Sequence, residues 1–198
     1  LFARITADIF SANGIRVYFF KELRPTPELS FAIRHFNCKS GVVITASHNP
    51  KEYNGYKAYW SDGAQMIAPH DVNVIKEVNA IHDFSQIRFE RDASLIEEVG
   101  EEVDQAYLEA LSGNVLSPES IRNQHDLSIV FSSIHGTGIT LVPAALEKIG
   151  FTNVQIVEEQ AEPDGNFPTV VYPNPEEAEA MSLSLEKARK VDADIVMA

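Results

Sequence analysis

The stretch GVVITASHNPKEYNGYK, residues 41–57, holds the strongest structural signal in this sequence. A short apolar run ends in the tetrapeptide SHNP (47–50), and Lys57 comes ten positions after Ser47. Bounded by a glycine and a proline, the run is typical of a buried β-strand. Open α/β sheets bind their ligands beyond the carboxyl ends of strands, so the polar residues that follow this strand predict a ligand site.

The residues around Ser47 fit a phosphate site. Pro50 pushes Asn49 out of helical geometry, which predicts an exposed loop. A hydroxyl in such a loop can act as a nucleophile or carry a phosphoryl group, and Lys57 supplies a charge suited to phosphate or to proton transfer. His48 adds a polar contact. From these residues alone, a plain polar turn followed by an exposed lysine is the more ordinary interpretation, and both stay open at this point.

Apolar and capping patterns in the first half predict alternating helices and strands. We expect a helix over residues 1–12 and a strand over residues 15–20. A second helix follows, with Thr26 as its N-cap. After the serine segment, residues 55–67 (GYKAYWSDGAQMI) predict a β-hairpin, and residues 69–81 predict a helix with one buried apolar face.

The second half repeats this alternation after a charged, irregular stretch. We expect residues 83–104 to form a solvated helix face or a linker, in preference to a metal site on their crowded glutamates. Beyond them we expect strands over residues 127–134, 153–159 and 193–198, and helices over residues 139–150 and 174–190, the latter capped by Asn174. His135, in the loop HGTG, is expected to belong to a structural turn. The alternation predicts an α/β fold with mainly parallel strands and a boundary near residue 100.

Composition excludes several classes of protein. With 44% hydrophobic and 23% charged residues, the chain is typical of a globular protein. Its net charge of −13 argues against nucleic acid or an anionic membrane as a partner, because both require clustered Lys and Arg. Cys38 is the single cysteine, which rules out an internal disulfide and indicates a reducing, cytoplasmic compartment. We expect Cys38 to be a packed thiol and not a nucleophile.

The wider motif resembles the active-serine segment of the α-D-phosphohexomutase superfamily, the phosphoglucomutases and phosphomannomutases. That segment reads T-A-S-H-N-P and then N-G-aromatic-K, and both parts are present here, at residues 45–50 and 54–57. Three further stretches resemble the phosphoglucomutase and phosphopentomutase branch: SDGAQ (61–65), HGTG (135–138) and FPTVVYPNPEEAEA (167–180).

The resemblance implies how the chain is organised. Residues 1–100 would be the C-terminal part of phosphohexomutase domain I, with the active-serine loop. Residues 101–198 would be domain II, truncated before its metal-binding loop. Each would be a three-layer α/β/α unit with a mixed, mainly parallel sheet, and both would be incomplete. The chain would thus be a fragment of a longer enzyme, and this fragment alone is expected to be inactive.

The resemblance also implies roles for individual residues. Ser47 would be the phosphorylated serine, and its phosphate would ligate Mg²⁺, whose aspartate ligands would lie beyond Ala198. Lys57 and His48 would act beside Ser47 in catalysis, Lys57 as general acid/base. Two further residues would support the phosphate and the loop: Asn49 and Thr45.

The implied activity is that of a Mg²⁺-dependent phosphosugar mutase, an isomerase that moves a phosphoryl group between C1 and C6 of a hexose phosphate. Its partners would be glucose 1-phosphate and glucose 6-phosphate, with glucose 1,6-bisphosphate as intermediate, and neither nucleic acid nor membrane. A phosphomannomutase or a phosphopentomutase is the alternative within the family, because the loops that choose the substrate are absent from this sequence.

Two alternatives from other classes also remain. One is a non-catalytic α/β binding module that has kept the serine loop. The other is a serine hydrolase, with Ser47 and a histidine as the catalytic pair. Against the hydrolase stand the missing G-x-S-x-G motif and the position of His48, which is too close in sequence to point back at its neighbour's hydroxyl.

Overall fold

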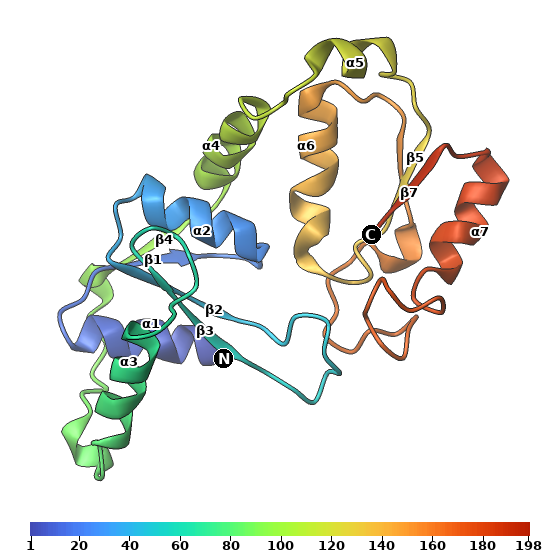
Figure 1. The fold of residues 1–198 in the computed structure, drawn as a ribbon. Coiled ribbons are helices and arrows are strands. Elements are labelled where there is room, and N and C mark those ends of the chain that lie inside the picture. The colour runs from blue at the N-terminus through green and yellow to red at the C-terminus, as the bar shows by residue number, and fades with distance from the viewer. The chain divides into compact units, whose positions relative to one another are not determined.

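The computed structural model describes all 198 residues, and its contacts divide the chain into two compact units (Figure 1). Unit 1 comprises Leu1–Thr45 and Gly55–Val103, and unit 2 comprises Ala46–Asn54 and Asp104–Ala198. Strands pair in parallel in three of the four ladders and antiparallel in one. The predicted α/β fold with mixed, mainly parallel sheets is therefore confirmed.

Unit 1 contains two two-stranded sheets. β1 (Val17–Phe20) pairs in parallel with β4 (Ile96–Val99). β2 (Ser40–Ile44) pairs antiparallel with β3 (Tyr56–Trp60), and the serine loop connects these two strands. The hairpin predicted over residues 55–67 is present in a reduced form: its first strand is β3, and its second side is a single antiparallel bridge between Tyr59 and Gln65.

β4 lies in the charged stretch that the sequence assigned to a linker, so that prediction was wrong. The charges of its two glutamates are met by arginines: Glu98 lies 3.4 Å from Arg4, and Glu97 lies 3.7 Å from Arg16. Val99, at the end of the strand, is buried. The segment can therefore form a strand although half of its residues are charged.

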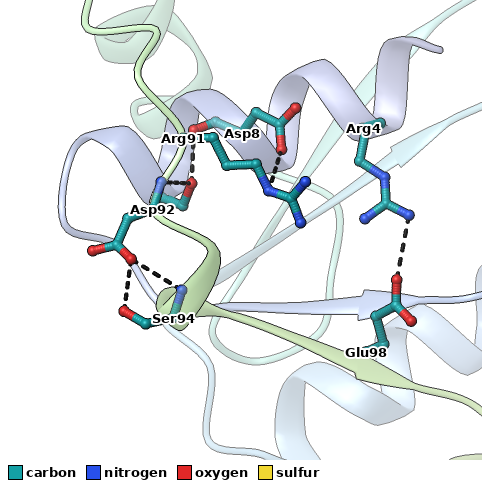
Figure 2. Close-up of polar contacts among 7 residues, drawn as sticks. Arg4, Asp8, Arg91, Asp92, Ser94 and Glu98 are labelled. Atoms are coloured by element: carbon teal, nitrogen blue, oxygen red, sulfur yellow. Dashed lines mark hydrogen bonds and ion pairs between the residues drawn. The ribbon is translucent and has the colours of Figure 1, made fainter.

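Polar contacts join helix α1 (Phe2–Ala12) to the chain that leads into β4 (Figure 2). The hydroxyl of Ser11 donates to the carbonyl of Asp8 (2.8 Å) and accepts from the backbone N–H of Asp92 (3.2 Å). Arg91 Nε lies 3.3 Å from a carboxylate oxygen of Asp8. These contacts fix two segments that are 81 positions apart in the sequence.

The core of unit 1 forms under α2 (Thr26–His35), where Ala32 packs with Val99 and Val103. Thr26 was predicted to be the N-cap of this helix, but the N-cap is Pro25 and Thr26 is the first helical residue. Two short 3₁₀ turns complete the elements before β4: η1 (Phe84–Gln86) and η2 (Ala93–Leu95).

Helix α3 (His70–Asn79) forms within the predicted range, but the prediction of a buried face was wrong. None of its residues is buried. The apolar side chains of Val72, Ile75 and Val78 are 62%, 58% and 54% exposed. The spacing of the apolar residues thus predicted the helix correctly. The apolar face that it predicted is not covered by another element of unit 1.

Unit 2 is built on a parallel sheet in the order β6-β5-β7. Central β5 (Ile129–Phe131) is fully buried, with β6 (Val154–Ile156) and β7 (Ile195–Met197) at the edges. α6 (Val142–Ile149) lies on one side of this sheet and α7 (Ser182–Val191) on the other (Figure 1). The remaining elements are α4 (Glu101–Ser112), α5 (Pro118–Asn123), η3 (Thr137–Thr140) and η4 (Glu158–Gln160).

Helix α7 begins eight residues later than its predicted cap, Asn174. Asn174 instead closes a turn, because its side-chain oxygen accepts from the backbone N–H of Glu176 (3.1 Å). A carboxylate oxygen of Glu179 accepts from the backbone N–H of Val171 (3.3 Å), which ties this segment to the preceding loop. No helix in either unit is long and apolar enough to cross a membrane.

Candidate functional site

The loop between β2 and β3 carries four of the five predicted site residues, and the fifth, Lys57, lies on β3 (Figure 1). A hydrogen bond from the backbone N–H of Thr45 to the carbonyl of Gly55 (2.9 Å) closes the base of this loop. Only glycine permits this approach, because a Cβ at position 55 would lie 2.8 Å from the carbonyl oxygen of Thr45. The Asn-Gly pair at 54–55 therefore returns the chain from the loop into β3.

Ser47 lies in a strained conformation. Its φ is 57°, in the left-handed region that non-glycine residues seldom occupy. Asn49 N–H donates to the carbonyl of Ala46 (3.1 Å), so Ser47 and His48 form the centre of a tight turn, where both are exposed. Such a backbone conformation costs about 1–3 kcal/mol, and this kind of strain concentrates at functional sites. The geometry therefore supports a functional role for Ser47.

His48 points back toward Ser47, with its Nδ1 atom 3.4 Å from the serine Oγ. The sequence-based argument that neighbouring side chains could not meet is thus wrong. The strained turn makes the contact possible, although 3.4 Å is long for a hydrogen bond. No carboxylate or carbonyl holds the other ring nitrogen of His48. A serine hydrolase needs such a group to orient its histidine, and the hydrolase alternative is weak on this ground.

Lys57 lies on β3, opposite Val43 of β2, and is half-buried. The chain therefore folds back after the serine loop and places Lys57 beside the strand that leads to Ser47. Thr45 and Asn49 both hold the loop through their backbone N–H groups.

The described residues do not form a metal site. No group of three or more His, Cys, Asp or Glu side chains is close enough to hold a metal ion. Asp194, which precedes β7, has a structural role, because its carboxylate accepts from the backbone N–H of Ser128 (2.9 Å). The serine hydroxyl alone does not fit the octahedral oxygen shell that Mg²⁺ requires. We therefore derive no reaction step through a metal.

Cys38, named in the sequence analysis, and His70 both have surroundings that indicate a structural role. Burial raises the pKa of the Cys38 thiol, which lowers its thiolate fraction at neutral pH and argues against a nucleophile. The ring of His70 stacks on Trp60, with 4.7 Å between the ring centroids.

An open cavity of about 570 Å³ lies beside the serine loop, within unit 2. One wall is formed by residues 50–53 of this loop, with the exposed ammonium group of Lys51. The second wall comes from the chain that follows η4. Its members are Asn166, Phe167, Val170, Val171 and Tyr172.

A buried set of polar side chains lies next to the second wall. Of its members, the sequence had indicated only His135, as part of a structural turn. Ser132 and Gln160 are 0% exposed, and His135 is 6% exposed. The hydroxyl of Ser132 donates to the side-chain oxygen of Gln160 (2.6 Å), and the Gln160 amide donates to the Thr169 hydroxyl (3.0 Å). Ser132 directly follows β5, and Gln160 lies just beyond β6. Polar residues at the carboxyl ends of neighbouring parallel strands were the signal that could have identified them.

Family models match most of the chain. The model described as phosphoglucomutase/phosphomannomutase, alpha/beta/alpha domain I, matches residues 1–84, and the one described as domain II matches residues 105–198. The chain is also similar to curated proteins. It is 36% identical over 197 residues to a phosphoglucomutase of Staphylococcus haemolyticus and 37% identical over 202 residues to a human phosphopentomutase.

Both of these alignments cover 100% of the chain, but only 36% and 33% of the relatives. The chain therefore spans about a third of the length of the curated relatives it matches. A solved structure agrees with the sequence matches. A Thermus thermophilus protein described as a phosphomannomutase superposes with a TM-score of 0.71 at 28% identity, over 94% of this chain and 39% of that one.

Proposed function

The chain belongs to the phosphoglucomutase/phosphomannomutase family, and we propose on this basis that it is part of a phosphosugar mutase whose Ser47 carries the transferred phosphoryl group. The observation that supports this role most directly is the exposed, left-handed Ser47 at the turn of a closed loop. Residues 1–100 would contribute the serine loop, and residues 101–198 would form the second domain.

The proposed cycle has two phosphoryl transfers. The phosphoryl group on Ser47 Oγ passes to the C6 hydroxyl of a hexose 1-phosphate, which loses its proton, and hexose 1,6-bisphosphate forms. The phosphoryl group on C1 then passes to Ser47 Oγ, and the C1 oxygen takes up a proton. The product is hexose 6-phosphate, and the phosphoserine is restored for the next cycle.

The neighbours of Ser47 would serve these two transfers. We assign to Lys57 the proton transfer at the sugar hydroxyl, or stabilisation of the charge on the transferring group. His48, whose Nδ1 lies 3.4 Å from Ser47 Oγ, would bind the phosphate. Asn49 and Thr45 would hold the loop in shape.

Mg²⁺ is the proposed cofactor of the complete protein, where it would offset the charge on the transferring phosphoryl group. Ser47 would contribute one ligand through its phosphate. The other ligands would come from outside the 198 residues.

The proposed substrates are glucose 1-phosphate and glucose 6-phosphate, in the cytoplasm. Relatives named phosphoglucomutase, phosphopentomutase and phosphomannomutase all resemble the chain. Mannose and pentose phosphates are therefore the alternative substrates within the family. A binding module without catalytic activity is the alternative from another class.

A coupled assay that follows glucose 6-phosphate formation from glucose 1-phosphate tests the proposal. The complete polypeptide should turn over with Mg²⁺ and a trace of bisphosphate, and EDTA should stop it. Lys57→Ala should lower kcat about a hundred-fold, the lower range for loss of a general acid/base. Lys76→Ala, at an exposed lysine of α3, is the matched control and should leave kcat unchanged.

Residues 1–198 alone should show no turnover in this assay. Absence of turnover by the complete polypeptide with glucose, mannose and pentose phosphates alike would favour the binding module. Equal losses in the two lysine variants would contradict the role assigned to Lys57.

A further inference from the structure

The buried polar side chains next to the second cavity wall form a hydrogen-bonded chain with a fixed direction. The backbone N–H of Ile134 donates to the hydroxyl of Ser132 (3.0 Å), which donates to the side-chain oxygen of Gln160 (2.6 Å). The Gln160 amide nitrogen then donates to the hydroxyl of Thr169 (3.0 Å). Gln160 thus uses both ends of its amide to link the end of β5 to the loop after η4.

His135 completes this chain and gives it one arrangement of protons. Its Nδ1 lies 3.1 Å from the carbonyl of Glu162, which can only accept, so Nδ1 carries the proton. Its Nε2 lies 3.0 Å from the Thr169 hydroxyl, and in the neutral imidazole this nitrogen is then the acceptor. Each hydroxyl in the chain therefore donates once and accepts once. A polar network that is satisfied in this way is rigid and favours a single packing.

The network supports a strained turn. Ile134 and His135 are both left-handed, with φ of 46° and 59°, and isoleucine is β-branched, which makes this conformation a true outlier. Backbone bonds fix the turn on both sides. His135 N–H donates to the carbonyl of Gln160 (2.9 Å), and Asp164 N–H donates to the carbonyl of His135 (3.1 Å).

Further backbone hydrogen bonds connect this turn to the second cavity wall. The carbonyl of Asp164 accepts from Phe167 N–H (3.0 Å), and the carbonyl of Phe167 accepts from Val170 N–H (3.1 Å). Phe167 is also left-handed, with φ of 50°. Phe167 and Val170 face the cavity opposite residues 50–53 of the serine loop. The network therefore fixes the cavity wall that lies opposite this loop.

We propose that Gln160, Thr169 and His135 are positioning residues for phosphoryl transfer, because they hold the wall at residues 164–171 that faces the serine loop across the cavity. This inference rests on the proposed mutase function. The side chains of Gln160 and Ser132 are fully buried, and each side chain of the network is hydrogen-bonded within it. None of the four side chains lines the cavity, so their influence on the reaction passes through the wall.

Thr169 offers a matched pair of variants for the test. Thr169→Val keeps the shape of the side chain but removes the hydroxyl that joins Gln160 to His135. Thr169→Ser keeps this hydroxyl. In the complete polypeptide, Thr169→Val should lower kcat about ten-fold, because small displacements at a reacting centre are costly. The KM for hexose phosphate should change less than about two-fold, since no substrate contact is lost. Thr169→Ser should retain the original kcat.

Amide hydrogen exchange of the same variants measures the wall directly. Exchange in residues 162–171 and in the serine loop, 46–54, should become faster in Thr169→Val and stay unchanged in Thr169→Ser. Equal kcat in the unaltered protein and Thr169→Val would overturn the inference. Equal losses in both variants, or a change in KM alone, would also overturn it.

Failure of the proposed function has a different signature, which is the absence of turnover in the unaltered protein. The exchange comparison still tests the network in that case. Unchanged exchange in Thr169→Val would show that the hydroxyl does not hold the wall.

Discussion

Gly55 is the residue on which the shape of the serine loop depends most clearly. The carbonyl of Thr45 approaches so closely that a Cβ at position 55 would lie 2.8 Å from it. Gly55→Ala should therefore push the two ends of the loop apart and displace Ser47. We expect kcat of the complete polypeptide to fall about ten-fold or more in the coupled mutase assay.

Gly100→Ala is the control for this substitution, because a Cβ at position 100 would meet no atom within 4 Å. Its kcat should stay within about two-fold of the unaltered protein. If Gly55→Ala also retained full activity, the closed base of the loop would not matter for catalysis.

The candidate site residues Ser47, His48 and Lys57 come from one continuous sequence motif, and their roles stay predictions. The structure shows how they are placed: the turn between β2 and β3 carries Ser47 and His48, and β3 carries Lys57. The contacts of the Gln160 network were not predicted, because its partners come from distant segments. Ser132 and Gln160 are 28 positions apart, and His135 and Thr169 are 34 apart, so no local spacing signals their contact.

Helices α4 and α6 are joined by an ion pair whose strength depends on pH. Lys148 Nζ lies 2.8 Å from a carboxylate oxygen of Glu109. The hydrogen bond from Lys148, and then its charge, lower the pKa of Glu109. A lowered pKa in the folded state stabilises the fold above the pKa of the unfolded state. This contribution is lost as the pH falls through the folded pKa.

Urea denaturation as a function of pH measures this contribution. Glu109→Gln should have a lower urea midpoint than the unaltered protein at neutral pH, and the difference should shrink progressively as the pH falls below the ordinary Glu pKa of about 4.3. The effect should be small, because the pair is exposed, and 1 M salt should reduce it. Lys148→Gln should cause the same loss, and the double variant no further loss. A difference that persisted at low pH would rule out the ion pair as its cause.

Elements were predictable where local pattern and packing agree. Strands β5 and β6 and helix α6 form inside their predicted ranges, and α6 ends at Gly150, whose φ is 119°. The errors at β4 and α7 have a shared cause. Glu98 of β4 bonds to Arg4, and Glu179 before α7 bonds to Val171 N–H. The first contact joins residues 94 positions apart and the second joins residues eight positions apart, and neither is visible in the local charge pattern.

At the level of the molecule, the family assignment rests on matches in both halves of the chain. The two family models match residues 1–84 and 105–198, and the solved relative superposes over 94% of the chain. The relatives are about three times longer than this chain, so the complete reaction would require more than these residues supply. The one step that these residues would carry out is the acceptance of a phosphoryl group by Ser47.

Intact-mass analysis after incubation with glucose 1,6-bisphosphate, followed by peptide mapping, tests this claim most directly. The complete polypeptide should gain the mass of one phosphoryl group, located on Ser47. Ser47→Ala should gain none, whereas Ser61→Ala, at the neighbouring hairpin turn, should gain it fully. A phosphoryl group found on another residue, or the same gain in Ser47→Ala, would contradict the account.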